Sequence, residues 1–373
     1  MHDLKTIRKP NEYVEDPIST TELCRFCLMC RHVCPVGHVT HNETLTPHGW
    51  GLMIASNRRG LLEWDQESVD ALYKCANCEL CHTHCVTNQP LPVAIASARA
   101  EVVEKGLAPE AVRSLDQALQ KWANPYVQEY PERASSQGEI GLYIGDGAHH
   151  VDPSTSQSAL QLLKAAGVEP VMLGVGRSSG VIASSLGLSK TAEELARSVL
   201  DEVAETGCKK VLVLAPVDLY AFKILYRERF NLTWPTDVEV QEVVSFLYDA
   251  QQGSRLSLDP KSDSRSYAYH DPCYAARTER DHSTVRKLLS KNLGSPPMEL
   301  FWHGKRAHPC GATGGLDLIQ PTLARQLTEA RLEDVRSSGA TLLITEDAVC
   351  LKQLQQYASS DLQVRGLYET LID

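Results

Sequence analysis

The sequence predicts an α + α/β protein, in which a mainly helical, cysteine-rich N-terminal domain precedes a duplicated α/β region. Eight of the twelve cysteines fall between Cys24 and Cys85, which indicates a small metal-rich module. After the mixed stretch 124–139, short apolar runs bounded by glycine alternate with helical stretches, a pattern typical of α/β units around a largely parallel sheet. We therefore expect three domains, spanning residues 1–130, 138–252 and 265–373.

Length, charge and composition restrict the class of protein. A chain of 373 residues with 43% hydrophobic and 23% charged residues can bury extensive cores. Its formal net charge of −10 argues against nucleic acid as a partner. No apolar run approaches the roughly 18 to 20 residues of a membrane span, and the first residues lack the apolar core of a secretory signal. We expect a cytoplasmic protein, in which clustered cysteines favour metal over disulfides, with any membrane contact made through a partner.

Both cysteine blocks read C-x2-C-x2-C-x3-C. Three cysteines two residues apart lie on a tight loop that can wrap three corners of a [4Fe-4S] cube, and the fourth points toward a second cluster. Zinc is the alternative, but four-cysteine zinc sites pair two C-x2-C knuckles and have no use for the third cysteine of each run. We expect two [4Fe-4S] clusters with crossed ligands: Cys24, Cys27, Cys30 and Cys85 at cluster 1, and Cys75, Cys78, Cys81 and Cys34 at cluster 2.

Helices are predicted around these blocks. Residues 48–64 indicate a helix with a break at Gly60, and residues 91–106 indicate a helix that ends at Gly106. Together with the two blocks, this stretch resembles the mainly helical two-cluster ferredoxin domain of respiratory iron–sulfur subunits. Four thiolates suffice for each cluster, so we expect the nearby histidines to be polar surface: His32, His38, His41, His82 and His84.

The α/β region reads as two copies of one unit. In the first copy a helix ends at Gly207, and Asp218 follows eleven residues later. In the second copy a helix ends at Gly339, and Cys350 follows eleven residues later. Both glycines stand where a helix C-cap needs a left-handed residue, and both precede an apolar strand. The equal spacing predicts a repeated βαβ-type unit in which only the second copy carries cysteines at these places.

Three segments of the second copy carry a family resemblance: "HDPC" at 270–273, "PCGATGG" at 309–315 and residues 347–350. They resemble the cysteine-rich (CCG) domain of the heterodisulfide reductase family, whose relatives include iron–sulfur subunits of glycolate oxidase, anaerobic glycerol-3-phosphate dehydrogenase and lactate-utilisation enzymes. A ferredoxin module followed by two such domains covers nearly the whole chain. The resemblance implies five ligand positions, occupied here by Cys273, Pro309, Cys310, Asp347 and Cys350. The first copy has "IGDG", "GVGRSSG" and "APVD" at the matching stretches and keeps none of the cysteines.

Three outcomes are open for Cys273, Cys310 and Cys350. They can hold a third [4Fe-4S] cluster, they can hold zinc together with a histidine, or they can be buried thiols that bind nothing. The paired noncubane clusters that cleave disulfides in some relatives need the full cysteine set, which this chain lacks. Cys208 is expected to be structural. Candidates for a fourth ligand of a cluster are His270, His303, His308, Asp347 and solvent.

The sequence shows no flavin fingerprint, and "CELCH" at 78–82 uses cysteines already assigned to cluster 2 rather than to haem attachment. We therefore assign no catalytic residue. The resemblance implies an electron-transfer subunit of an oxidoreductase complex, which relays electrons between an FAD-containing flavoprotein dehydrogenase and a quinone-linked, membrane or flavoprotein acceptor, in either direction. The alternative is a reductase that acts on a heterodisulfide or another small substrate at the metal site of Cys273, Cys310 and Cys350.

Overall fold

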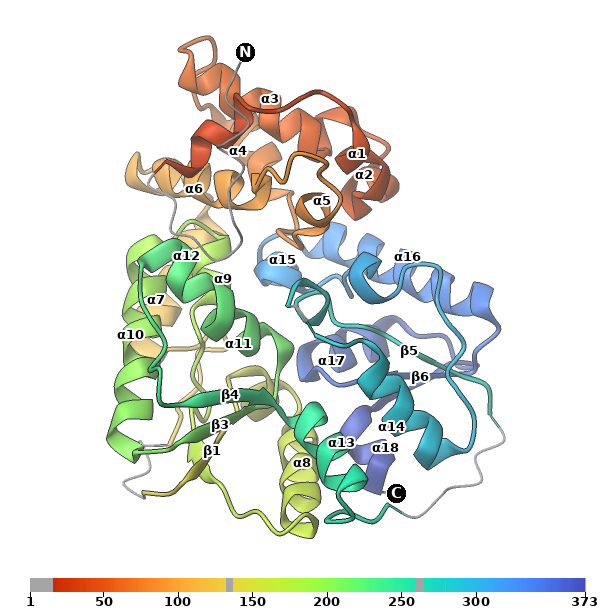
Figure 1. Cartoon of the computed structure of the whole chain (residues 1–373). Helices are drawn as coiled ribbons and strands as arrows, with labels where there is room; N and C mark the ends of the chain where they lie inside the picture. The colour runs from red at the N-terminus through yellow and green to blue at the C-terminus, as the bar shows by residue number, and fades with distance from the viewer. Residues whose placement is uncertain (1–15, 132–136, 259–264, 279, 373) are drawn as a thin grey trace.

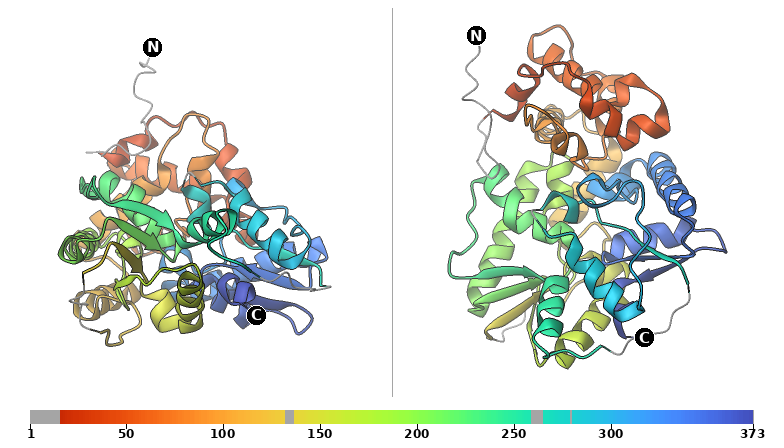
Figure 2. Two further views of the ribbon diagram at one scale, coloured as in Figure 1. Left: turned by 60° about the horizontal axis from the view of Figure 1, so that its bottom comes forward. Right: turned by 45° about the vertical axis from the view of Figure 1, so that its right-hand side comes forward.

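The structure, a computed structural model, describes residues 16–131, 137–258, 265–278 and 280–372. Residues 1–15 and the centre of the stretch 124–139 lie outside the described residues. Figure 1 shows the N-terminal helices as a cap above two α/β units, the first on the left and the second on the right. Both views of Figure 2 show the same three-part arrangement. A mixed α/β fold with a helical, cysteine-rich N-terminal region is thus confirmed.

The N-terminal cap contains helices and no strand among its described residues, 16–131. Gly60 and Gly106 stand two residues after the ends of α3 (Pro47–Arg58) and α6 (Leu91–Glu104), with left-handed φ angles of 69° and 71°. The helix predicted to end at Gly106 is confirmed, whereas the helix predicted over residues 48–64 ends at Arg58 and does not resume after Gly60. The last helix of the cap reaches down to the first α/β unit, where Thr191 donates a hydrogen bond to Asp116 (2.6 Å). The helices are η2 (Pro17–Thr21), α1 (Met29–Val33), α2 (Pro35–Thr40), η3 (Glu43–Leu45), α3 (Pro47–Arg58), α4 (Gln66–Tyr73), α5 (Leu80–Thr83), α6 (Leu91–Glu104) and α7 (Glu110–Trp122).

The first α/β unit has a four-stranded parallel sheet in the order β2-β1-β3-β4. Its strands are β1 (Ile140–Tyr143), β2 (Val171–Leu173), β3 (Lys210–Val213) and β4 (Glu239–Glu242). The central strands are short apolar runs buried on both faces, as parallel sheets require. The helices are η4 (Gly147–Val151), α8 (Pro153–Ala165), α9 (Val181–Ser185), α10 (Ser189–Thr206), α11 (Pro216–Tyr220), η5 (Ala221–Leu225), α12 (Tyr226–Phe230) and α13 (Val243–Gln252).

The second unit has a three-stranded parallel sheet in the order β5-β6-β7, and Met298 forms a further parallel bridge to Ala268 of β5. Its strands are β5 (Tyr267–Tyr269), β6 (Leu342–Thr345) and β7 (Gln363–Gly366). The helices are η6 (Ala275–Arg277), α14 (Ser283–Leu293), η7 (Gly304–Arg306), η8 (Thr313–Gly315), α15 (Leu316–Ile319), α16 (Pro321–Ser338), α17 (Ala348–Tyr357) and α18 (Leu367–Ile372).

The two units repeat one arrangement. Helices α10 and α16 each span 18 residues and end on a left-handed glycine, Gly207 and Gly339. A strand begins three residues after each glycine, at Lys210 and at Leu342. The strand order also agrees, because the bridge at Met298 stands where β2 stands in the first unit.

Equivalent positions follow from the strand registers. Lys210 pairs with Ile140 in the first unit, and Leu342 pairs with Tyr267 in the second. Counting forward from these pairs aligns the strand ends of the two units. The equivalent residues are Tyr143 and His270, Ile144 and Asp271, Asp146 and Cys273, and Asp218 and Cys350.

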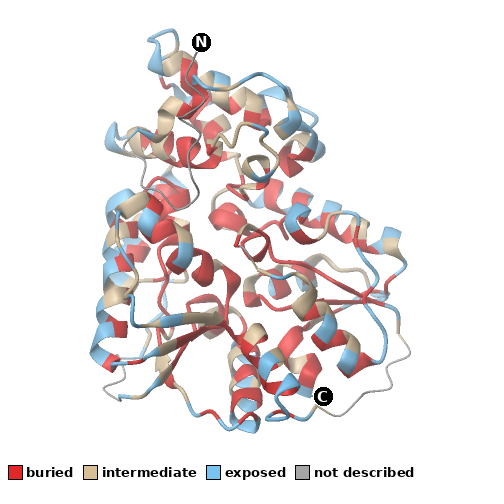
Figure 3. Ribbon diagram, viewed as in Figure 1, coloured by how far each residue is buried: buried red, intermediate tan, exposed pale blue. Residues whose placement is uncertain are grey.

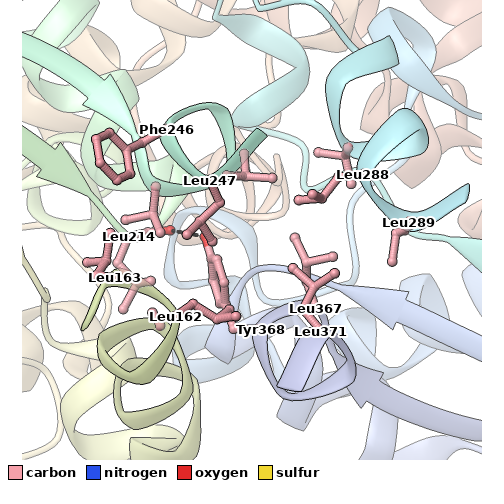
Figure 4. Close-up of a cluster of buried hydrophobic side chains, with 14 of the residues drawn as sticks. Leu162, Leu163, Leu214, Phe246, Leu247, Leu288, Leu289, Leu367, Tyr368 and Leu371 are labelled. Carbon is pink, nitrogen blue, oxygen red and sulfur yellow. Dashed lines mark hydrogen bonds between the residues drawn. The ribbon is translucent and has the colours of Figure 1, made fainter. Parts of the chain in front are cut away.

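The units share one hydrophobic core. Helix α8 packs against α18 and α13 packs against α14, so each unit contributes one helix to each contact. Figure 3 shows buried residues continuing across the boundary between the units. Figure 4 shows the side chains that meet there, among them Leu162, Leu163, Leu247, Leu288, Leu289, Leu367 and Leu371.

A second core fixes the cap onto both units. Trp50 and Tyr73 of the cap share one buried cluster with Leu186 of the first unit and Leu327 of the second. The buried guanidinium of Arg99 adds polar contacts, since it donates to the carbonyls of Leu72, Cys75 and Ser185. Among the helices that the structure describes, none is long and apolar enough to cross a membrane.

Candidate metal centres

The two N-terminal cysteine loops share an unusual backbone. In each loop, both residues flanking the second cysteine are left-handed: Phe26 and Leu28 (φ 55° and 61°), and Asn77 and Glu79 (φ 49° and 60°). Residues other than glycine rarely adopt this conformation, and it persists only where the surroundings fix it. The two loops therefore curl in the same way.

Backbone amides point at cysteine sulfurs in both loops. The amide of Phe26 donates to Sγ of Cys24 (3.4 Å), and the amide of Asn77 donates to Sγ of Cys75 (3.3 Å). Amide donors favour the charged form of the acceptor, so these contacts are suited to thiolates. The fourth cysteine of each block is matched in the same way: Cys34 accepts from the amide of Gly37 (3.4 Å), and Cys85 accepts from the amide of Gln89 (3.3 Å).

The residues predicted for cluster 1 lie around a cavity near the surface. Cys24, Cys27, Cys30 and Cys85 line this cavity, which has an empty volume of about 660 Å³. Burial, and repulsion from the other three sulfurs, raise the pKa of Cys30 to about 11. Cys27 is exposed, whereas the other three are half-buried. The structure thus brings these four cysteines together at the edge of the molecule.

The residues predicted for cluster 2 lie deeper. Cys34, Cys75, Cys78 and Cys81 line a second cavity of about 330 Å³. Burial, and repulsion from Cys75, Cys78 and Cys34, raise the pKa of Cys81 well above its ordinary value. Cys34 and Cys78 are buried. Because Cys81 also lines the first cavity, the two cysteine sets adjoin each other.

The three cysteines of the second α/β unit meet at the ends of its strands. His270, Cys310 and Cys350 offer ligand atoms within 4.8 Å of one another, and all three residues are buried. Cys273 joins them: burial, followed by repulsion from Cys310, raises its pKa to about 12. A hydrogen bond with Cys310, followed by burial, raises the pKa of Cys350. Ends of parallel strands are where α/β folds place ligands.

Two of the predicted fourth ligands lie outside the group of close ligand atoms. The ring of His308 stacks on Trp302, with 4.1 Å between ring centroids, and burial lowers its pKa to about 2. Nδ1 of His303 lies 2.5 Å from the carbonyl oxygen of Leu300. Among the described residues, neither histidine belongs to the group of close ligand atoms.

His270 and Asp347 lie at the cysteines, but each already has a hydrogen bond. Oδ1 of Asp347 caps helix α17 by accepting from the amide of Cys350 (2.9 Å). Burial raises the pKa of Asp347. Nδ1 of His270 lies 3.0 Å from Nε of Arg331. A ring nitrogen of His270 also lies within 4.8 Å of the sulfurs of Cys310 and Cys350, so His270 is close enough to act on a metal centre there.

A cavity between the two units opens beside these cysteines. It has an empty volume of about 720 Å³ and is lined by Cys273, Cys310 and Cys350 from the second unit and by Asp146 and Asp218 from the first. Burial raises the pKa of Asp146 to about 6 and that of Asp218 well above its ordinary value. No sequence motif predicted that these aspartates belong to a site. The only sequence feature that pointed to them was the register of the repeat, in which they occupy the positions of Cys273 and Cys350.

Arg277 joins the second cysteine loop, Cys75–Cys81, to the C-terminal cysteines. It lies four residues after Cys273, and its Nε donates to the carbonyl of Cys78 (2.8 Å), 199 residues away in the chain. Cys78 and Cys273 share one buried cluster of side chains, and the charge of Cys78 contributes to the raised pKa of Cys273. The third cysteine group therefore lies next to the second.

Two features define the class to which this protein is compared. One is a helical cap with two four-cysteine loops, and the other is an α/β unit with three further cysteines, packed against the cap. Residues 267–355 match the family described as the CCG cysteine-rich domain. The chain is 24% identical over 325 residues to a subunit of the dihydromethanophenazine:CoB–CoM heterodisulfide reductase of Methanosarcina barkeri, and the match covers 83% of this chain and 79% of the relative. The chain therefore carries a CCG domain and is a distant homologue of that heterodisulfide reductase component, as the sequence predicted.

Two further likenesses extend this result. A "Probable membrane-anchored ferredoxin" of Chromohalobacter salexigens is 27% identical over 219 residues, which span 58% of this chain and 32% of that protein. A crystal structure of a hypothetical protein from Helicobacter pylori aligns with a TM-score of 0.59 and 12% identity, over 91% of this chain and 70% of its own. At that identity the second likeness shows a shared fold.

Proposed function

We propose that this protein is an iron–sulfur electron-transfer subunit of an oxidoreductase complex. It binds two [4Fe-4S] clusters at the crossed cysteine sets of the cap and a third iron–sulfur centre at Cys273, Cys310 and Cys350. The observation that carries the proposal is the serial order of the three cysteine groups. They run from exposed Cys27, through buried Cys78, to Cys273 between the α/β units.

The side chains fit such centres. Buried thiolates are costly unless a cation compensates them, and iron–sulfur clusters are held by thiolates. Backbone amides already point at four of the sulfurs. At the third site, buried Nε2 of His270 has no hydrogen-bond partner among the described residues, which leaves room for an acceptor at that place. When bound, the clusters supply one-electron redox chemistry, and the protein sets their position and exposure.

The exposed end of the series supports contact with a partner protein. Phe26, Met29 and Val86 are exposed apolar side chains beside the cysteines of the first set. Apolar side chains around a redox centre suit a protein contact. We propose an FAD-containing flavoprotein dehydrogenase as donor and a quinone-linked or flavoprotein acceptor, with electrons passing in either direction, in the cytoplasm.

Metal counting on the anaerobically purified chain tests the proposal. Three cubane clusters give about twelve irons per chain, and two give about eight. We expect Cys27→Ser to remove cluster 1 and destabilise the cap, since metal binding and folding are coupled in small metal-rich regions. Cys310→Ser should remove only the third centre. Unchanged iron in Cys27→Ser, or loss of all the iron in Cys310→Ser, would contradict the assignment.

A second candidate function rests on the cavity between the units. Its volume of about 720 Å³ beside Cys310 admits a small substrate, so a reductase acting on a heterodisulfide or similar molecule is the alternative. Such an enzyme turns over disulfide with a chemical electron donor and no flavoprotein partner. Turnover that is lost in Cys310→Ser and kept in Cys208→Ser, a buried cysteine in the first unit's core, supports the reductase.

A further inference from the structure

A buried pair, His270 and Arg331, lies beside the cysteines of the second unit. Arg331 stands on α16, and both side chains are almost fully buried. The Nε–H group of Arg331 donates to Nδ1 of His270 (3.0 Å). Nη1 donates to the carbonyl of Trp302 (2.7 Å) and to Oδ2 of Asp334 (2.6 Å). These three hydrogen bonds, made by two of its nitrogens, hold the guanidinium in place.

The contact to Arg331 decides where His270 carries its proton. A guanidinium has only donors, so Nδ1 of His270 must be the acceptor. The hydrogen bond at one ring nitrogen fixes the state of the other, so the proton of the neutral ring lies on Nε2. A protonated nitrogen has no lone pair for a metal. Histidine ligands show the reverse arrangement, in which the second nitrogen donates to a carboxylate or carbonyl.

Nε2 of His270 is a donor that lacks an acceptor. It is buried and has no partner in the part of the chain that the structure describes, while a ring nitrogen of His270 lies within 4.8 Å of the sulfurs of Cys310 and Cys350. A buried N–H group without an acceptor is costly, and native structures usually satisfy such groups. A thiolate or a cluster sulfide at the cysteines would supply the acceptor.

The pair occurs only in the unit that has cysteines. At the position of His270 the first unit has Tyr143, whose hydroxyl donates to the carbonyl of Arg177 (3.3 Å). Arg331 stands eight residues before Gly339, and Val199 stands eight residues before Gly207. The first unit therefore keeps the helix and strand but not the polar pair.

We propose that His270 is a hydrogen-bond donor to the sulfur of the third centre rather than its fourth ligand, and that Arg331 fixes it in this role. The inference rests on the proposed third centre. A hydrogen bond to sulfur stabilises the reduced, more negative state, so His270 raises the reduction potential of the centre. The fourth metal position is left to Asp347 or to a molecule from the cavity.

Metal content and reduction potential test the role on the full chain with its clusters. His270→Gln places an amide N–H near the position of Nε2, and His270→Ala removes the donor. Cys310→Ser is the control for loss of a ligand. We expect His270→Gln to keep the wild-type metal content and potential. We expect His270→Ala to keep the metal at a lower potential, and Cys310→Ser to lose the metal of this centre.

The outcomes separate the inference from the proposed function. A wild-type chain with no metal beyond the two clusters of the cap overturns both. A wild-type chain that holds the metal, with a His270→Gln chain that loses it as Cys310→Ser does, overturns the donor role alone. Pulsed EPR of the reduced centre, with 15N-labelled histidine, makes the test on the wild-type chain and so does not depend on the folding of a variant. Weak nitrogen coupling supports His270 as a hydrogen-bond donor, and strong coupling identifies it as a ligand. Should the centre hold zinc, metal content decides between the same two roles.

Discussion

The two α/β units have the same frame and different chemistry at the ends of their strands. Cys273 and Cys350 of the second unit correspond to Asp146 and Asp218 of the first, and all four line one cavity. The second unit therefore presents sulfur to the cavity, and the first presents carboxyl groups. Such a frame tolerates either set because strand registers and helix caps depend on the backbone and the apolar faces, while the site depends on a few side chains.

The largest difference between the units in stability should come from Asp271, at the position of Ile144. Its carboxylate is buried and accepts from Nη1 and Nη2 of Arg286 (3.0 and 2.8 Å) and from the amide of Gly304 (2.9 Å). Breaking a buried ion pair by removing one partner costs about 3–5 kcal/mol. We expect Asp271→Asn to lower the free energy of unfolding by about 3 kcal/mol, because Arg286 keeps a second partner in Glu299.

The pH dependence of this effect has a definite sign. Burial tends to raise the pKa of Asp271, but the nearby ring of His282 (Nδ1 3.6 Å from Oδ1) and the hydrogen bonds from Arg286 outweigh burial and hold the pKa far below its ordinary value. The stabilisation is therefore present above the unfolded pKa of about 3.9 and is lost as the pH falls below that value. In denaturant unfolding, the free energies of unfolding of the wild-type chain and of Asp271→Asn should therefore converge in acid. Ile144→Val is the matched control in the first unit, with an expected cost of about 1 kcal/mol; an equal loss in both variants would contradict the asymmetry.

The shared core should show the opposite behaviour, with equal effects in both units. Leu247 and Leu371 each lie four residues after the first residue of the helix that follows the last strand of their unit. Both are buried in the common cluster (Figure 4). We expect Leu247→Ala and Leu371→Ala to cost similar amounts, about 2–5 kcal/mol each, in chemical denaturation. A large cost for only one of them would mean that the units do not share a cooperative core.

The smallest expected effect concerns Asp146. Burial raises its pKa to about 6 in the folded chain, against about 3.9 when unfolded. A raised carboxyl pKa means that stability is lost as the pH rises from about 4 to about 6. Asn does not ionise, so Asp146→Asn should avoid this loss, which amounts to up to about 2 kcal/mol in the free energy of unfolding. The variant should therefore be more stable than the wild type at neutral pH. Superimposable unfolding profiles of the two chains across this pH range would show that Asp146 is not desolvated.

Parts of the site were predictable because their signals are local. The C-x2-C-x2-C-x3-C spacing pointed to the eight cysteines of the cap, and the register from Gly207 and Gly339 pointed to the equivalence of Asp218 and Cys350. The roles of His303 and His308 were not predictable. Their distance from Cys310 along the chain is short, yet the backbone directs their rings to Leu300 and Trp302.

Local patterns in the chain were enough to specify the cysteine-rich helical region, the parallel α/β units and the kinship to CCG proteins, because spacing, helix-ending glycines and apolar runs act over a few residues. Which groups meet depends instead on the packing of the folded chain. Arg277 reaches the loop of Cys78, and Arg331 orients His270, through contacts between residues 199 and 61 positions apart. Such contacts form only when whole helices pack against each other, and no short stretch of the chain records them.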